Sequence, residues 1–214
     1  MKKIINPVLN ARLLKFPWGD ICQGFGENIA LYQKAIGING HNGINIIKPE
    51  GTPILATTGV VCEVKDTPEG YGKHIRILTL PDENKEYFEL TYGHLKDIYV
   101  KIGDRVEDGQ EIGTLGNTGF VISGNTVYWG SAPAGKGYHL HFGTRACSEY
   151  NTGWQAIYST GYTAFIKNYE DRQKGSIDPM LFLDVPEDIT AKIEILKRLV
   201  AALAMAIQMF INKK

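Results

Sequence analysis

Residues 40–115 consist of short runs rich in β-branched side chains, and glycine, proline or aspartate interrupts each run. Short strands separated by such turn residues are typical of an antiparallel β-sandwich or barrel-like sheet. The predicted strands are Ile44–Ile47, Ile54–Leu55, Gly59–Val64, His74–Leu80, Phe88–Tyr92, Ile98–Val100 and Glu111–Leu115. The stretch from Val100 to Gln110 predicts a strand, a tight turn and a second strand. The fold class is therefore mainly β.

The chain of 214 residues is long enough for one domain with a full core and two flanking segments. Residues 1–37 predict an irregular N-terminal lead-in, because turn residues interrupt them. Residues 38–185 make up the β domain. Two insertions lie within it, a Gly/Ser/Asn-rich loop near 120–137 and an aromatic segment near 148–176.

The aromatic insertion carries large rings at a spacing of three to four residues: Tyr150, Trp154, Tyr158, Tyr162, Phe165 and Tyr169. This spacing predicts a helix with an aromatic face. We expect that face to pack against the sheet, as aromatic side chains usually do. The alternative is a wall beside the site on which sugars or peptides stack.

Residues 186–214 predict a C-terminal apolar α-helix over 187–211. The apolar run from Leu199 to Ile211 is shorter than the roughly 20 residues that span a bilayer. Packing on the domain or self-association is the first interpretation, because a helix that is apolar all round is usually buried in protein. Contact with a membrane surface is the alternative.

Composition excludes several classes of protein. The formal net charge is zero and the chain has no basic run, which argues against a nucleic-acid partner. Three cysteines without a CxxC pair predict neither a disulfide framework nor a thiolate zinc site. The first residues lack a sustained apolar run and a small-residue cleavage site, so we expect no signal peptide.

Two histidine phrases have the spacing of a metal site. In a strand, residues i and i+2 point to the same face, so His139 and His141 project together. The same rule puts His41, Gly43 and Asn45 on one face, where Gly43 leaves room for a metal ion. If two such strands are neighbours, His41, Asn45 and His141 converge and leave a fourth position open, which is the arrangement of a catalytic zinc.

His94 and the remaining HxH histidine would then be free to move protons and to stabilise an oxyanion. His74 lies in a plain strand pattern, and we leave it out of the predicted site. The alternative for each histidine is a structural residue with a satisfied hydrogen bond.

Several phrases of the sequence resemble the M23 peptidase family, the lysostaphin- and LytM-type zinc endopeptidases. The resemblance runs in order through residues 24–145 and is most specific in HLHF and in VKIGDRVEDGQEIG. The matching phrases are Gly24–Gly26, His41–Asn45, Gly51–Ala56, Gly59–Val61, Gly70–Lys73, Tyr92–Leu95, Val100–Gly113, Gly116–Gly119, His139–Phe142 and Asp178–Pro179.

The resemblance implies an antiparallel β fold of the duplicated hybrid motif type, with a groove over the sheet. It implies a Zn²⁺ cofactor held by His41, by the residue at position 45 and by His141. It also implies that His94 and His139 are the catalytic pair. The implied substrate is a peptide bond in bacterial peptidoglycan.

The chain departs from the family pattern at its third ligand, where Asn45 replaces an aspartate. With two histidines and an aspartate a zinc site carries a net charge of +1, and with asparagine it carries +2. We therefore expect weaker zinc binding and a more acidic bound water. The two insertions also differ from the family, so the preferred cross-link cannot be transferred.

The leading hypothesis is a zinc metallo-endopeptidase that cleaves peptidoglycan cross-links. The rival is an M23-like module without catalytic power that binds the cell wall or regulates another enzyme, and Asn45 is its best support. A third interpretation is a structural cap attached to a virion or membrane through the C-terminal helix. The expected lack of a signal peptide favours a phage- or mobile-element-borne enzyme, released at lysis, over a secreted one.

Overall fold

The computed structural model describes residues 3–124, 126–149, 154–158, 163–171, 173–184 and 200. The chain divides into two units, Met1–Asp184 and Val185–Lys214. The predicted helix over residues 187–211 falls outside the described residues, apart from Val200. No helix among the described residues is long and apolar enough to cross a membrane.

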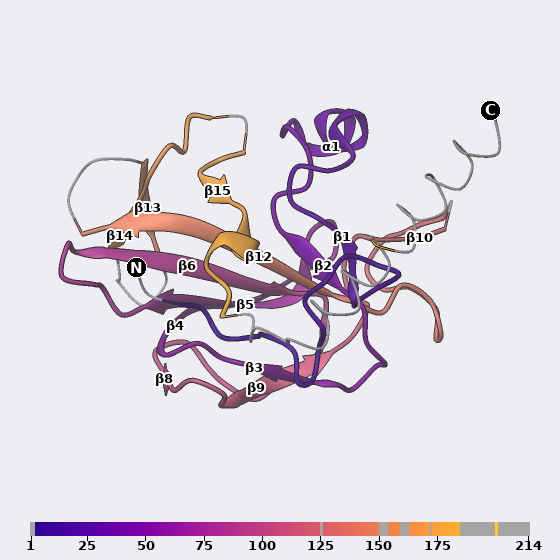
Figure 1. The fold of residues 1–214 in the computed structure, drawn as a ribbon, viewed down its shortest axis with the longest axis horizontal. Coiled ribbons are helices and arrows are strands. Elements are labelled where there is room, and N and C mark those ends of the chain that lie inside the picture. Colours follow the sequence, from indigo (N-terminus) through magenta and orange to yellow (C-terminus); the bar gives the residue numbers. More distant parts are fainter. Residues whose placement is uncertain are drawn as a thin grey trace. The chain divides into compact units, whose positions relative to one another are not determined.

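The first unit is mainly β and antiparallel, as the sequence predicted (Figure 1). Its elements are β1 (Ile21–Gln23), α1 (Ile29–Ile36), β2 (Ile44–Ile46), β3 (Pro53–Leu55), β4 (Gly59–Thr67), β5 (Gly72–Thr79), β6 (Glu86–Gly93), β7 (Leu95–Ile98), β8 (Arg105–Val106), β9 (Glu111–Leu115), β10 (Val121–Ser123), β11 (Thr126–Tyr128), β12 (Leu140–Ser148), β13 (Trp154–Ile157), β14 (Thr163–Ile166), β15 (Ser176–Ile177) and a 3₁₀ turn, η1 (Pro179–Leu181). The large sheet has the order β1-β2-β12-β6-β5-β4-β8, with β14 and β15 also paired to β12 and β13 paired to β14. A smaller sheet has the order β3-β9-β7.

The main core lies between these two sheets, because strand residues alternate between faces. In β5, Ile75 and Ile77 point into the core, and His74 and Arg76 point to the opposite face. Fully buried side chains from both sheets fill this layer: Ile44, Ile46, Ile54, Ile75, Ile77, Leu90, Tyr92, Leu95, Ile112, Leu115, Leu140 and Phe142. One face of the large sheet is therefore apolar, and its other face is free to carry polar side chains.

The aromatic insertion forms a hairpin in its described part, so the predicted helix there is wrong. Strands β13 and β14 pair with each other, and β14 adds to the edge of β12 through Cys147 opposite Ile166. The edge of β12 presents backbone donors and acceptors that need partners, and β14 supplies them at Cys147 and Ser148. Tyr158 is buried against the sheet, in a second apolar cluster with Leu78, Tyr87 and Cys147.

Two other segments contain more regular structure than the sequence indicated. The first 37 residues include β1 and α1 and contribute Ile4, Val8 and Leu13 to the core. The Gly/Ser/Asn-rich insertion contains the β10–β11 hairpin. The predicted strand Ile98–Val100 is reduced to Ile98, the last residue of β7.

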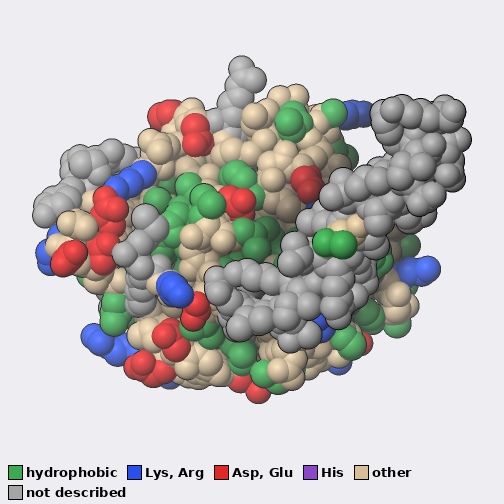
Figure 2. Space-filling view, in the orientation of Figure 1, with side chains coloured by type: hydrophobic (Ala, Val, Ile, Leu, Met, Phe, Trp, Pro, Cys, Tyr) green, Lys and Arg blue, Asp and Glu red, His purple; other side chains and the backbone are tan. Residues whose placement is uncertain are grey.

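Acidic and basic side chains are interspersed on the face drawn in Figure 2, without a large patch of one sign. No histidine is visible among the described side chains of that face. This agrees with the burial of His41, His94, His139 and His141.

The N-terminal segment closes the core of the first unit. Ile4 is fully buried, and its backbone pairs with Phe182 and Asp184 beyond the 3₁₀ turn. Ile4→Ala is expected to lower the free energy of unfolding by about 2–5 kcal/mol, because it leaves a cavity in the core. Leu9→Ala, at a side chain 42% exposed on the same segment, should change it by less than about 1 kcal/mol. Urea unfolding of both variants tests this, and equal small effects would contradict a role for the segment in the core.

Candidate active site

Three neighbouring strands bring the predicted site residues together. In the antiparallel ladders of β12, His141 lies opposite Asn45 of β2 on one side and opposite Gly93 of β6 on the other. His94 follows Gly93 directly, and His139 precedes β12 by one residue. This register sets Asn45 beside His141, and the loop before β2 brings His41 to His141.

His41 lies before β2 rather than within it. The loop after β1 holds its backbone: Gly26 N–H donates to the His41 carbonyl, and His41 N–H donates to the Glu27 carbonyl, both at 2.8 Å. Its Nδ1 lies 3.1 Å from the carbonyl oxygen of Gly24. Because a carbonyl only accepts, Nδ1 carries the hydrogen, and Nε2 presents a lone pair to the site.

The two predicted histidine ligands face each other. His41 Nε2 lies 3.0 Å from His141 Nδ1. Two nitrogens bound to one tetrahedral zinc ion would lie about 3.3 Å apart. The pair is therefore close to the separation that a shared metal ion requires.

Gly43 has a different role from the one predicted. A Cβ atom at this position would lie 2.5 Å from the carbonyl oxygen of Phe142 and 2.9 Å from two ring atoms of His141. The absent side chain makes room for the His141 ring rather than for a metal ion. Any larger residue would push that ring away from His41.

Asn45 supplies the third potential donor. Its Nδ2 donates to Gln23 Oε1 at 2.9 Å, and its Oδ1 is buried with no hydrogen-bond partner among the described residues. Its free lone pair can coordinate a cation, because an amide oxygen is an acceptor. No group of three His, Cys, Asp or Glu side chains in the described part of the chain could hold a metal, so a three-ligand site depends on this amide. Two imidazole nitrogens and a neutral amide oxygen fit a zinc ion, although this set lacks the anionic ligand of a site with two histidines and an aspartate.

His94 and His139 form a second pair, with ring centroids 4.6 Å apart. His94 Nδ1 donates to the Thr118 carbonyl at 2.7 Å, and His139 Nδ1 donates to the Gly137 carbonyl at 2.8 Å. Both rings, when neutral, therefore present an Nε2 lone pair. His94 itself has a φ of 63°, a conformation rare for residues with a side chain, where the chain passes from β6 to β7.

A close backbone crossing fixes the Thr118 carbonyl that holds His94. A Cβ on Gly119 would lie 2.2 Å from the Gly72 nitrogen, and one on Gly72 would lie 2.4 Å from the Thr118 carbonyl carbon. Both glycines have positive φ, so only residues without a Cβ fit this crossing. The crossing also places Tyr71 beside the histidines.

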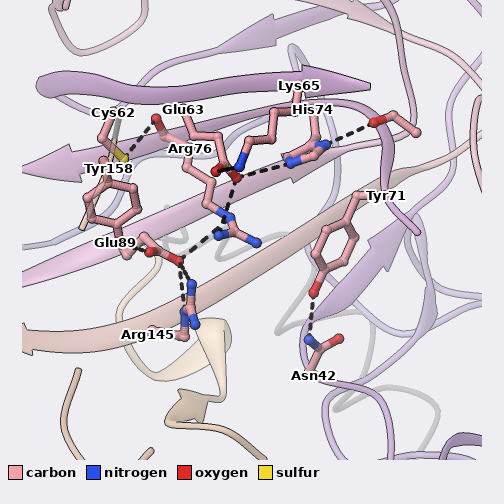
Figure 3. Close-up of polar contacts among 11 residues, drawn as sticks. Asn42, Cys62, Glu63, Lys65, Tyr71, His74, Arg76, Glu89, Arg145 and Tyr158 are labelled. Atoms are coloured by element: carbon pink, nitrogen blue, oxygen red, sulfur yellow. Dashed lines mark hydrogen bonds and ion pairs between the residues drawn. The ribbon is translucent and has the colours of Figure 1, made fainter. Parts of the chain in front are cut away.

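Tyr71 is a site residue that the sequence reasoning did not single out, although it lies in the GYGK phrase. Its hydroxyl accepts from Asn42 Nδ2 at 2.6 Å, and its ring packs on His141 with centroids 4.8 Å apart. Figure 3 shows Tyr71 between Asn42 and His74. Tyr71 therefore links the HNGIN phrase to the polar face of the large sheet.

The polar face beyond Tyr71 carries a buried ion network (Figure 3). Glu63 pairs with His74 and Arg76, both at 3.3 Å. Burial would raise the pKa of Glu63, but the hydrogen bond from His74 and the neighbouring positive charges lower it to about 2. His74 is thus engaged here and lies outside the four-histidine cluster. Further along the face, Glu89 binds Arg145.

Tyr32, on α1, is a second residue that the pattern did not reveal. Its ring lies 5.4 Å from that of His41, and its hydroxyl donates to Gln23 Oε1 at 3.4 Å. Burial raises the pKa of Tyr32 to about 12, so it remains a neutral donor. No sequence pattern indicated this residue, because its contact with His41 forms only in the folded chain.

All four clustered histidines are neutral at pH 7. Burial lowers the pKa of His41 to about 4, and the Gly24 carbonyl opposes this only in part. Burial also lowers the pKa of His94 and His141 well below the usual value, and mutual repulsion among the rings adds to it. The pKa of His139 is lowered by burial as well. Neutral imidazoles are the form that binds metals and accepts protons.

Comparison with known proteins gives the family. A profile of Peptidase family M23 matches residues 39–153, more than half of the chain and all four clustered histidines. The chain belongs to the M23 peptidase family.

Two curated relatives illustrate the match. Glycyl-glycine endopeptidase ALE-1 of Staphylococcus capitis is 36% identical over 110 residues, which cover 50% of this chain and 25% of that protein. Peptidoglycan DD-endopeptidase ShyC of Vibrio cholerae is 35% identical over 91 residues, which cover 42% of this chain and 20% of that protein. The matched segment therefore spans a quarter or less of these relatives. Among solved structures, the catalytic domain of the antimicrobial peptidase lysostaphin from Staphylococcus simulans is 25% identical, with a TM-score of 0.44 over 69% of this chain and 83% of that one.

The lowered pKa values predict an acid-sensitive metal-free fold. Unfolded histidines take up protons near pH 6.5, whereas folded His41 resists protonation down to about pH 4. Stability is therefore present above about pH 6.5 and is lost as the pH falls towards about 4. Urea unfolding in chelator at several pH values measures this loss. His41→Gln combined with His139→Gln should flatten the slope, and an unchanged slope would contradict the assignment.

Proposed function

We propose that this chain is a zinc metallo-endopeptidase that cleaves peptide cross-links of bacterial peptidoglycan. In this proposal His41, Asn45 and His141 bind the metal, and His94 and His139 are catalytic. Membership of the M23 peptidase family supports the reaction class. The endopeptidase names of the relatives in Staphylococcus capitis and Vibrio cholerae support the substrate.

One observation carries the metal assignment. His41 Nε2 and His141 Nδ1 lie 3.0 Å apart, next to an Asn45 Oδ1 that is buried and without a partner in the described part of the chain. Three lone-pair donors directed at one another are unfavourable unless a cation or a proton lies between them. Bound zinc would supply Lewis-acid activation of the scissile carbonyl and of the attacking water.

His139 is the proposed general base. Its Nδ1 hydrogen is held by the Gly137 carbonyl, so the Nε2 lone pair is free to take a proton from the attacking water. The lowered pKa of His139 keeps that lone pair available at neutral pH. The same nitrogen then returns the proton to the leaving amine.

His94 is the proposed oxyanion stabiliser, and its hydrogen bond at Nδ1 determines when the ring can donate to the oxyanion. Because Nδ1 already donates to the Thr118 carbonyl, the ring donates at Nε2 only when it carries a second proton. The rings of His94 and His139 are close enough for one proton to favour either ring. The pair therefore acts as one unit that is neutral before water attack and singly protonated after it.

The second candidate function is a cell-wall-binding or regulatory module of the same fold. Asn45 favours it, because an amide lacks the charge that an aspartate contributes to zinc binding. This module would bind peptidoglycan in the presence of chelators, and Asn45→Asp would not create activity. Under either function we propose that the protein acts at the cell wall, which the names of its relatives support.

Zinc content separates the two functions. Elemental analysis after dialysis against a mild chelator should give about one zinc per chain, and His141→Ala should remove it. Asn45→Asp should tighten binding by about tenfold or more, because it adds a negative charge to the site. No zinc above the His141→Ala background, even after resupply, would favour the non-catalytic module.

Removal of the base should abolish cleavage without unfolding the chain. His139→Ala is expected to reduce the release of muropeptides from purified sacculi by about 10²- to 10⁴-fold. Its zinc content and melting temperature should match those of the unaltered chain. Lys136→Ala, in the exposed loop just before this histidine, is the matched control and should retain activity. Normal release by His139→Ala would rule out this histidine as the base.

A further inference from the structure

We propose that Gln23 is a positioning residue that fixes the Asn45 amide with its oxygen towards His41 and His141, and so sets the zinc affinity of the site. This inference rests on the proposed function, because it concerns the same metal. It explains how an asparagine can replace the aspartate of the family pattern.

The contact is built into the β1–β2 ladder. Gln23 lies opposite Asn45, next to an irregularity in the register between Ile21 and Gln23. Asn45 Nδ2 donates to Gln23 Oε1 at 2.9 Å, and the Tyr32 hydroxyl donates to the same oxygen at 3.4 Å. Asn45 Nδ2 thus uses Gln23 Oε1 as its acceptor, and Asn45 Oδ1 is left buried without a partner among the described residues.

An amide needs such a partner, whereas a carboxylate does not. Both oxygens of an aspartate accept, so either orientation of its end presents a lone pair to a metal. An asparagine rotated by half a turn would present its NH₂ group, which repels a cation and donates where the site needs lone pairs. While Gln23 keeps Oε1 beside residue 45, that orientation is disfavoured, because the rotated asparagine amide would place two oxygens against each other.

The residue that follows β1, Gly24, acts in the same way on another ligand. The Gly24 carbonyl accepts from His41 Nδ1 at 3.1 Å and so holds the Nε2 lone pair towards the site. Gln23 and Gly24 together therefore orient two of the three proposed ligands. Such outer partners of metal ligands typically change metal affinity by about 10- to 100-fold when they are removed.

The test measures zinc dissociation constants of the full-length chain by competition with a chromogenic chelator. Gln23→Met keeps the side-chain length and removes the acceptor, and it should weaken zinc binding by about 10- to 100-fold. Gln23→Glu keeps an acceptor and should bind at least as tightly as the unaltered chain. Gln110→Met is the matched control, because Gln110 Oε1 also accepts a hydrogen bond, from Glu107 N–H, away from the site.

The decisive comparison is the Asn45→Asp background. There the end of residue 45 accepts in either orientation, so Gln23→Met should change zinc affinity by less than about threefold. An equal loss in both backgrounds would indicate a general structural role and overturn the inference. Gln23→Ala repeats the comparison if the methionine variant has a lowered melting temperature. If the unaltered chain binds zinc and Gln23→Met binds it equally tightly, this inference alone is overturned. If the unaltered chain binds no zinc, the proposed function is overturned as well.

Discussion

The register of β12 against its two neighbours is the constraint on which the site depends. It sets His141 opposite Asn45 on one side and opposite Gly93 on the other. A shift of one residue in either ladder would turn His141 into the core, because side chains alternate between faces. The apolar layer between the sheets opposes such a shift, since Leu140 and Phe142 would then leave it. The core thereby fixes the position of the polar site on the other face.

Burial gives the cluster its chemical character. Water is largely excluded from all four histidines, so their protonated forms are disfavoured and lone pairs accumulate in a small volume. The adjacent network pairs the charges of Glu63 and Arg76, and His74 makes a further contact with Glu63. The same face of the sheet therefore holds two kinds of polar cluster. One consists of ion pairs, and the other retains buried acceptors, Asn45 Oδ1 and His141 Nε2, without a partner among the described residues.

The replacement of a carboxylate by an amide changes two properties of the site. The first is charge, which would rise from +1 to +2 around a zinc ion. The second is symmetry, because an amide has one binding end and one end that donates. The contact of Asn45 with Gln23 compensates for the lost symmetry by orienting the amide. It does not restore the lost negative charge, so the attraction for the metal is weaker. The two effects are separable, because the loss of charge changes the Coulomb energy, whereas the loss of symmetry matters only through the side-chain dihedral angle of Asn45.

The sequence by itself determined the β class and most strand positions, because these depend on local patterns with a period of two. Its short motifs singled out the four histidines as candidates. It also indicated that His41, Asn45 and His141 converge. It failed for the described part of residues 148–176, where aromatic spacing suggested a helix but β14 pairs with the edge of β12. It also failed for Tyr71, Tyr32 and Gln23, because their contacts join segments that are distant in the chain or meet only after folding. Tertiary structure alone decided which lone pairs face the site and which side chain orients Asn45, because those properties depend on hydrogen bonds between strands and loops that no local pattern encodes.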